Sequence, residues 1–210
     1  QSAVAVDWSP NGEPSLILAA DTQNQKLFLA EAKSNGVKIR WEYKLPAPPR
    51  TVHVCPDTGN FLVTLQDSTV EEIFFQEDKV AWSLGKENGL KDVRDAVRNP
   101  WAQTFVADAS GGLILCFDPG KNILWKTRLP FTGDHAFEEM ALSLYKKNGK
   151  RMVMASVHLS PGGGPGARDI LYLLNAETGK VIAWSDRPEK GDYPALLKAV
   201  PDIAVYQKKE

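Results

Sequence analysis

Three histidines carry most of the chemistry that this 210-residue sequence could perform: His53, His135 and His158. Imidazole nitrogens are common metal ligands and exchange protons near neutral pH. His53 and Cys55 are two residues apart, so on a β-strand they would share a face and could form one edge of a metal site. The alternative is a pair that points into a core, because cysteine packs well as a small apolar side chain.

A second candidate set follows four strand-like apolar runs at equivalent places in the sequence: Asp21, Asp67, Asp108 and His158. If these runs end at one face of the fold, their side chains form an arc that could hold a divalent cation or a polar ligand such as a sugar. Alternatively, each carboxylate caps its own hairpin by accepting a backbone hydrogen bond two residues on. We predict that any functional site lies on this face.

The longest predicted hairpin follows His158 and is rich in glycine and proline, Leu159–Asp169. Its glycine spacing is similar to that of a phosphate-binding loop, but such loops present backbone N–H groups at the start of a helix. No helix-like pattern follows here, and two prolines interrupt the segment. We therefore predict an inserted loop over one face, the kind of segment in which function is often located.

Composition excludes several partners and leaves the cellular compartment open. The chain has 25 basic and 26 acidic residues and a net charge of −1, which argues against nucleic acid or an anionic membrane as partner. No apolar run approaches the roughly 20 residues that a membrane helix needs. The two cysteines, Cys55 and Cys116, stand in strand patterns and are predicted to be buried thiols. No sequence pattern requires a cofactor.

Four tryptophans repeat in one local pattern, a β-branched residue, a spacer and Trp, each after a turn-forming stretch: Ile39-Arg40-Trp41, Val80-Ala81-Trp82, Ile123-Leu124-Trp125 and Ile182-Ala183-Trp184. The tryptophans are 41, 43 and 59 residues apart. A period of about 40 residues with four strands in each unit is typical of a β-propeller. The sequence therefore predicts an all-β fold, a propeller-type array of four-stranded antiparallel blades in a single domain.

The predicted repeats span about 1–46, 47–90, 91–132 and 133–195. The first two contain strands at Val4–Trp8, Leu16–Ala20, Lys26–Ala30 and Lys38–Tyr43, then Thr51–Cys55, Phe61–Leu65, Thr69–Phe75 and Val80–Leu84. The last two contain Asp95–Val97, Thr104–Ala107, Leu113–Phe117 and Ile123–Arg128, then Met140–Tyr145, Met152–Val157, Ile170–Leu174 and Lys180–Trp184. The connection Gly85–Arg98 is long and charged, and we expect its basic residues to be solvated.

All four repeated tryptophans are expected to be largely buried, since an aromatic side chain in the fourth strand can pack into the next blade. Beyond them, Leu196–Tyr206 has the pattern of one further strand that pairs with an existing sheet. Four repeats could form a small closed propeller, an open arc, or half of a ring that another chain completes. Open sheet edges invite pairing, so we expect closure within the chain or by a partner.

The order of strand, polar turn, strand, glycine-containing turn and [Val/Ile]-x-Trp resembles the PQQ-like and arylsulfotransferase-like repeat. Phe61–Leu65, Val70–Ile73 and Lys79–Leu84 show it most clearly. The resemblance covers most of the chain and implies a propeller fold. Quinoproteins with this repeat bind their quinone beside a metal ion, and arylsulfotransferases use a histidine nucleophile. Neither set of residues can be matched here, and the resemblance also implies a periplasmic or secreted location.

Two functions compete on this evidence. The first is a noncatalytic propeller that binds a protein, peptide or glycan on the face built from the long loops. The second is an enzyme, or a protein that carries a metal or cofactor, with its site over the central channel near His53, His135 and His158. Because no recognisable catalytic arrangement is present, we favour the first. The partner is then a protein or carbohydrate, and a second chain or a larger parent chain could complete the ring.

Overall fold

The computed structural model describes residues 5–8, 16–33, 36–131, 136–147, 149–160 and 168–186, with the backbone alone for 5–8, 33, 147, 168, 185 and 186. They form four antiparallel four-stranded sheets, here called blades 1 to 4, and in every blade the strands lie side by side in chain order. Blade 1 contains β1 (Ala5–Trp8), β2 (Leu16–Asp21), β3 (Lys26–Lys33) and β4 (Gly36–Lys44), and blade 2 contains β5 (Pro49–Val54), β6 (Phe61–Leu65), β7 (Val70–Phe74) and β8 (Lys79–Leu84). Blade 3 contains β9 (Val93–Arg98), β10 (Thr104–Asp108), β11 (Leu113–Phe117) and β12 (Ile123–Arg128), and blade 4 contains β13 (Ala136–Lys147), β14 (Lys150–Ser160), β15 (Arg168–Asn175) and β16 (Val181–Asp186). The predicted fold class is confirmed.

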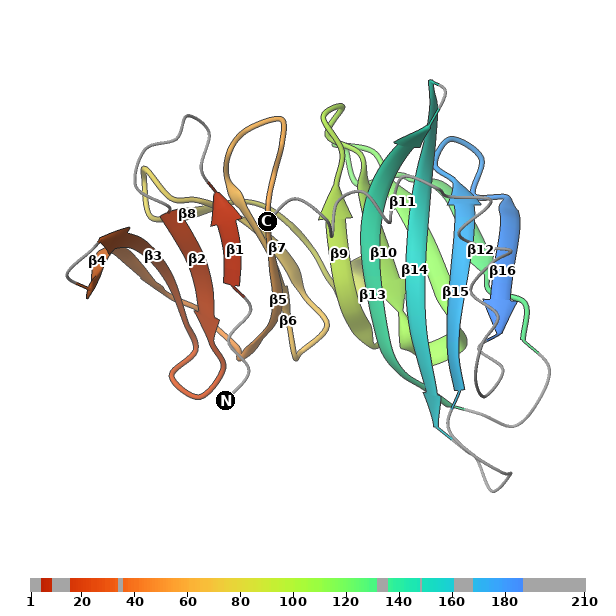
Figure 1. Ribbon diagram of the computed structural model, residues 1–210, viewed down its shortest axis with the longest axis horizontal. Coiled ribbons are helices and arrows are strands. Elements are labelled where there is room, and N and C mark those ends of the chain that lie inside the picture. The colour runs from red at the N-terminus through yellow and green to blue at the C-terminus, as the bar shows by residue number, and fades with distance from the viewer. Residues whose placement is uncertain are drawn as a thin grey trace.

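The blades stand next to one another in an arc, with blade 1 at one end and blade 4 at the other (Figure 1). The first strands of the middle and last blades contact one another, β5 with β9 and β9 with β13, so they line the inner side of the arc. The fourth strands lie outside and alternate between exposed and half-buried positions, as in β12. The second strands β6 and β10 are buried along their whole length, because neighbouring blades cover both of their faces.

Three apolar clusters hold the arc together, one at each junction between blades. Leu18 of blade 1 and Phe61 of blade 2 belong to the first cluster, and Leu62 of blade 2 and Phe117 of blade 3 to the second. The third contains Phe105 of blade 3 and Tyr172 of blade 4. No cluster of the described residues joins blade 4 to blade 1, so these residues form an open arc. The predicted strand Leu196–Tyr206 lies outside the described residues.

The repeated tryptophans occupy the junctions, but only three of them as predicted. Trp41, Trp82 and Trp125 are half-buried, and each donates its indole N–H to the hairpin between the third and fourth strands of the following blade. Trp184 is 52% exposed, so the prediction that all four would be largely buried is wrong for this residue. The reason is that no described blade follows blade 4.

The connection Gly85–Arg98 is also more ordered than the sequence indicates. It contains a short 3₁₀ helix, Lys86–Asn88, and all of β9. The side chain of Arg98 is only 4% exposed, since it forms an ion pair with Glu72 and lies over the ring of Trp82 at 4.5 Å. The predicted solvated face is therefore wrong for Arg98, because a buried carboxylate and an aromatic ring compensate its charge.

Candidate functional site

The ends of the second strands and the starts of the first strands meet on one face of the arc, as the sequence predicted. Thr22 follows β2, Gln66 follows β6, and His158 lies near the end of β14. Together with Arg50 of β5 and Arg94 of β9 they line a cavity of about 390 Å³ that all four blades border. We call it the mouth cavity, because it lies at one end of the inner side of the arc.

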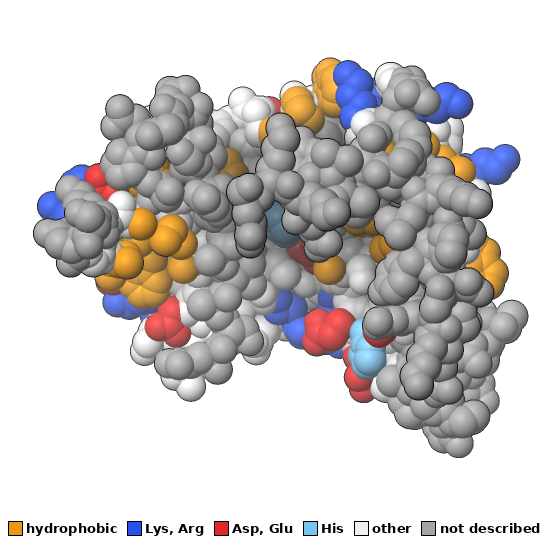
Figure 2. All heavy atoms as spheres, in the orientation of Figure 1, with side chains coloured by type: hydrophobic (Ala, Val, Ile, Leu, Met, Phe, Trp, Pro, Cys, Tyr) orange, Lys and Arg blue, Asp and Glu red, His pale blue; other side chains and the backbone are white. Residues whose placement is uncertain are grey.

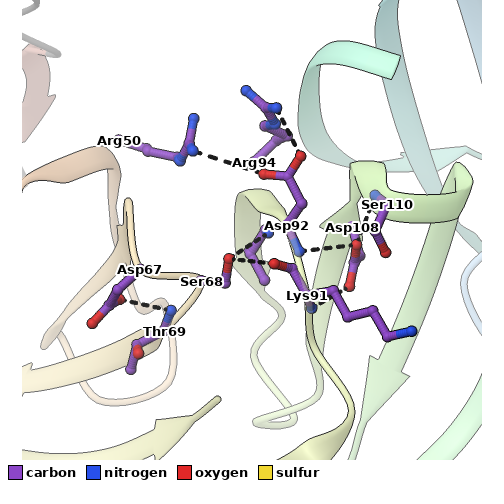
Figure 3. Close-up of polar contacts among 10 residues, drawn as sticks. Arg50, Asp67, Ser68, Thr69, Lys91, Asp92, Arg94, Asp108 and Ser110 are labelled. Atoms are coloured by element: carbon purple, nitrogen blue, oxygen red, sulfur yellow. Dashed lines mark hydrogen bonds and ion pairs between the residues drawn. The ribbon is translucent and has the colours of Figure 1, made fainter. Parts of the chain in front are cut away.

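The three aspartates predicted at the ends of second strands, Asp21, Asp67 and Asp108, cap turns. Asp21 accepts hydrogen bonds from the backbone and side-chain nitrogens of Asn24, at 3.0 and 2.7 Å, and these bonds lower its pKa. Asp67 accepts from the backbone N–H of Thr69 at 3.0 Å (Figure 3). Asp108 accepts from Ser110 N at 2.9 Å in the same way. The turn-cap interpretation is confirmed for all three, and their carboxylates are engaged by their own hairpins.

Asp108 has a further role, because it fixes the segment that leads into β9. Its side chain is buried and also accepts hydrogen bonds from the backbone of Lys91, at 2.8 Å, and of Asp92, at 3.2 Å. Burial acts to raise the pKa of Asp108, but the hydrogen bonds from Ser110, Lys91 and Asp92 outweigh it and lower the pKa. From blade 2, Ser68 Oγ donates to Lys91 O at 2.9 Å (Figure 3). The segment is thus held from two blades.

This rigid segment presents a carboxylate between two arginines (Figure 3). Asp92 Oδ2 accepts a hydrogen bond of 2.7 Å from Arg94 Nη2, and Asp92 Oδ1 lies 3.7 Å from Arg50 Nη2. Each arginine is the second residue of its strand, β5 or β9. The Nε atoms of both are buried and have no hydrogen-bond partner in the described part of the chain. Two cations against one anion leave a net positive charge at this side of the mouth cavity, suited to carboxylate or phosphate oxygens.

The wall that blade 4 contributes is acidic and contains His158. His158 Nδ1 lies 2.7 Å from Asp169 Oδ1, and Nε2 lies 4.0 Å from Glu138 Oε2. The hydrogen bond to Asp169 is the main reason why the pKa of His158 is raised above 6.5. Glu139 lines the same cavity. Basic, acidic and histidine side chains lie side by side on this part of the surface (Figure 2).

A second cavity, of about 550 Å³, lies beside the first between blades 3 and 4. We call it the side cavity. Arg94 borders both cavities, and the side cavity adds Arg128 together with the rings of Phe131 and Phe137. These two rings meet edge to face at 6.4 Å. The side cavity therefore offers cationic and aromatic contacts next to the charged mouth.

The remaining predicted site residues do not form a described metal centre. His53 Nε2 lies 2.8 Å from Asp95 Oδ1, inside the arc, and the placement of His135 is outside the described residues. Burial raises the pKa of the Cys55 thiol, and likewise that of Cys116, to about 12, so both stay protonated and are poor ligands and nucleophiles. Cys55 packs in the core and does not share an open face with His53. Among the described residues, no group of three or more His, Cys, Asp or Glu side chains is placed to hold a metal ion.

Apart from His158, the charged residues of the mouth were not predicted as site residues. Arg50 and Arg94 occupy the same position of successive first strands, so an alignment of those strands would have paired them across the mouth. Asp92 immediately precedes β9, in a connection expected to be solvated. The sequence alone does not reveal that Asp108 and Ser68 fix this connection.

Comparison with known proteins bears on the fold. The chain matches no family model and no curated protein sequence. It is similar to solved structures of Sqt1 from Saccharomyces cerevisiae (TM-score 0.59, 12% identity, 87% of this chain and 47% of that one) and of the WD40 domain of Toxoplasma gondii coronin (0.61, 7%, 84% and 45%). A third is BBS1N in its complex with ARL6DN (TM-score 0.60, 12% identity, 89% of this chain and 54% of that one). The chain has a β-propeller fold.

The chain spans about half the length of these three solved chains. Identities this low show the fold alone. None of the comparisons identifies the PQQ-like or arylsulfotransferase-like repeat that the [Val/Ile]-x-Trp motif resembles. Among the described residues, no helix is long and apolar enough to span a membrane.

Proposed function

We propose that this chain is a noncatalytic binding module of the propeller class and that it recognises a peptide segment of a protein partner at the mouth cavity. One observation carries the proposal: the walls of the mouth have opposite charge. Arg50 and Arg94 stand on blades 2 and 3, and Glu139 and Asp169 stand on blade 4. A segment that carries acidic and basic side chains close together would meet a complementary charge on each side.

The geometry is suited to binding. The groups at the mouth are already paired, Arg94 with Asp92 and His158 with Asp169, and these pairs fix their orientation before a ligand arrives. Preorganised charged side chains lower the entropy cost of association. The comparison with BBS1N, solved in complex with ARL6DN, supports a protein as the partner class. The aromatic rings of the side cavity would hold an apolar residue next to the charged ones.

The test is a selection of peptides from a random display library on the immobilised chain. We expect the selected peptides to contain both acidic and basic residues and to bind more weakly as salt concentration rises. The double variant Arg50→Glu, Arg94→Glu should lose this binding. The control variant Lys126→Glu carries the same kind of change on the outer strand β12 and should keep it. Peptides that bind the double variant as well as the parent would place the site elsewhere.

A further inference from the structure

Asp92 lies between the two arginines of the mouth but is not equally close to both (Figure 3). Its Oδ2 atom accepts a hydrogen bond of 2.7 Å from Arg94 Nη2, whereas its Oδ1 atom lies 3.7 Å from Arg50 Nη2. A separation of 3.7 Å is too long for a hydrogen bond. Arg94 is therefore held by Asp92, whereas the guanidinium of Arg50 donates no hydrogen bond within the described part of the chain.

Both arginines line the mouth cavity, while Asp92 lines the side cavity next to it. The side chains of Arg50 and Arg94 are 26% and 20% exposed, so a ligand in the mouth cavity can reach them. Such a ligand would contact the arginines without taking the place of Asp92. The donors of Arg50 are then free for the ligand, and Asp92 remains beside both cations.

The backbone that carries Asp92 is fixed by hydrogen bonds from two blades. Asp108 of blade 3 accepts from the backbone N–H groups of Lys91 and Asp92, at 2.8 and 3.2 Å. Ser68 of blade 2 donates its hydroxyl to Lys91 O at 2.9 Å. A carboxylate on a fixed backbone stays close to the arginines when a ligand arrives, so Asp92 is a built-in counter-charge of this group.

The charges around the arginines favour a ligand group with one negative charge over a group with two. Arg50 and Arg94 supply two positive charges and Asp92 removes one, so a single carboxylate completes the neutralisation. A second negative charge on the ligand would be repelled by Asp92, and also by Glu139 and Asp169, which line the mouth cavity from blade 4. A repulsive element of this kind gives specificity by weakening the binding of the wrong ligand.

We infer that the Arg50–Asp92–Arg94 group is a subsite for one side-chain carboxylate, and that Asp92 makes it discriminate against phosphorylated side chains, which carry about two negative charges. The inference rests on the proposed function, because it identifies the acidic residue of the bound peptide as aspartate or glutamate. Arg50 supplies unused N–H donors for a two-pronged contact with the carboxylate, and Arg94 supplies the second positive charge. Asp92 determines specificity through its charge, without contact to the ligand.

The first experiment uses small anions, so its result does not depend on the proposed peptide binding. Acetate represents a side-chain carboxylate, and sulfate, a tetrahedral dianion, represents a phosphorylated side chain. Each anion is titrated at constant ionic strength and neutral pH, and NMR follows the Nε–H signals of Arg50 and Arg94. These signals are assigned by their loss in Arg50→Lys and Arg94→Lys. In the parent, acetate should shift the Arg50 signal at lower concentrations than sulfate does.

Asp92→Asn tests the role of the charge, because the amide oxygen can still accept the hydrogen bond from Arg94. The repulsion between Asp92 and an anion is proportional to the charge of the anion, so its loss should affect sulfate twice as strongly in free energy. We expect acetate to bind roughly threefold more tightly to this variant and sulfate roughly tenfold more tightly. The control Asp67→Asn removes the same charge from an exposed turn of the same face and should change either affinity by less than about twofold.

The second experiment uses a peptide selected in the display experiment, synthesised with either glutamate or phosphoserine at its acidic position. The parent should bind the glutamate form more tightly, and Asp92→Asn should reduce this preference about threefold or more. If no peptide is selected, the proposed function fails, whereas the acetate and sulfate titrations still decide whether the subsite selects a single charge.

Other outcomes would overturn the inference. If neither anion shifts the signals of Arg50 and Arg94, the group is not an anion subsite. A parent that binds sulfate more tightly than acetate does not select a single charge. If Asp92→Asn binds both anions more weakly, or gains equally for both, Asp92 orients Arg94 and does not exclude a second charge. Equal gains in Asp67→Asn would mean that the net charge of the face decides.

Discussion

Asp95 Oδ2 accepts a hydrogen bond of 2.7 Å from the backbone N–H of Leu142, so one buried carboxylate joins the inner strands of blades 3 and 4. Its other oxygen reaches blade 2, where Thr51 Oγ1 donates at 2.7 Å and His53 Nε2 lies at 2.8 Å. Asp95 itself is 2% exposed. Three blades therefore share one acceptor on the inner side of the arc, directly behind the wall of the mouth cavity that contains Thr51.

Replacing Asp95 by Asn should destabilise the protein by about 3 kcal/mol. The shape is retained, but the amide nitrogen would face a backbone N–H that can only donate, that of Leu142 at the Oδ2 position or that of Ala96 at the Oδ1 position. Chemical denaturation measures the free energy of unfolding, and Asp57→Asn, on an exposed turn, is the control that should change it by less than about 0.5 kcal/mol. Equal stability of Asp95→Asn and the parent would mean that this carboxylate does not tie the blades together.

The buried ion pair between Glu72 and Arg98 should be costly to break from one side. Asn60 Nδ2 and Thr58 Oγ1 also donate to Glu72, at 2.7 and 2.9 Å. Glu72→Gln leaves the buried guanidinium of Arg98 without its counter-charge, and we expect the free energy of unfolding to fall by about 3–5 kcal/mol. Glu42→Gln removes a partner of the exposed pair with Lys26 and should cost at most about 1 kcal/mol. If both variants lose a similar amount of unfolding free energy, the buried pair matters no more than the exposed one.

The same pair predicts a direction for the pH dependence. Burial acts to raise the pKa of Glu72, but hydrogen bonds from Asn60, Arg98 and Thr58 and the charge of Arg98 outweigh it and lower the pKa below 4.5. A lowered folded-state pKa contributes stability that is present above the unfolded value and is lost as the pH falls through the folded value. Stability of the parent should therefore decrease in acid more steeply than that of Glu72→Gln, as measured by denaturation at a series of pH values.

Gly179, at the junction between blades 3 and 4, should tolerate alanine less well than Gly149, which lies in a turn. Gly179→Ala should therefore lower the free energy of unfolding more than Gly149→Ala does. Both glycines have left-handed backbones, with φ of +70° and +77°, so both substitutions carry a similar strain of about 1 kcal/mol. At Gly149 the new methyl group meets nothing within 4 Å, whereas at Gly179 it collides with Trp125 and Thr127. The free energy of unfolding, measured by chemical denaturation, should be about 1–3 kcal/mol lower in Gly179→Ala than in Gly149→Ala. Equal losses would show that the junction has room to adjust.

The fold was predictable because its signals are local. Alternating apolar runs and turn residues placed all sixteen strands of the array to within a few residues, and β6 and β11 match the predicted Phe61–Leu65 and Leu113–Phe117 at both ends. The [Val/Ile]-x-Trp motif marked each fourth strand. The exposure of Trp184 was not predictable, since it depends on which blade comes next and not on the motif itself.

The candidate site was predictable only in its location. Strand alternation places the ends of the second strands on one face, and this located the mouth before any contact was known. The choice of Asp21, Asp67 and Asp108 as ligands competed with their role as turn caps, and the hydrogen bonds show the caps. The Arg50–Asp92–Arg94 group is assembled from two blades, so no spacing in the sequence reveals it.

His158 should titrate at a pH above the usual 6.5 of histidine, mainly because of its hydrogen bond to Asp169. A raised folded-state pKa means that the pair contributes stability below pH 6.5, and that this contribution is lost as the pH rises through the raised value. NMR of the imidazole protons measures the pKa directly. Asp169→Asn should move it back toward 6.5, whereas Glu138→Gln should change it less, since that carboxylate lies 4.0 Å away and forms no hydrogen bond to the ring. An unchanged pKa in Asp169→Asn would show that the blade 4 wall is not organised by this pair, and that protonation of His158 is not coupled to the acidic side of the mouth.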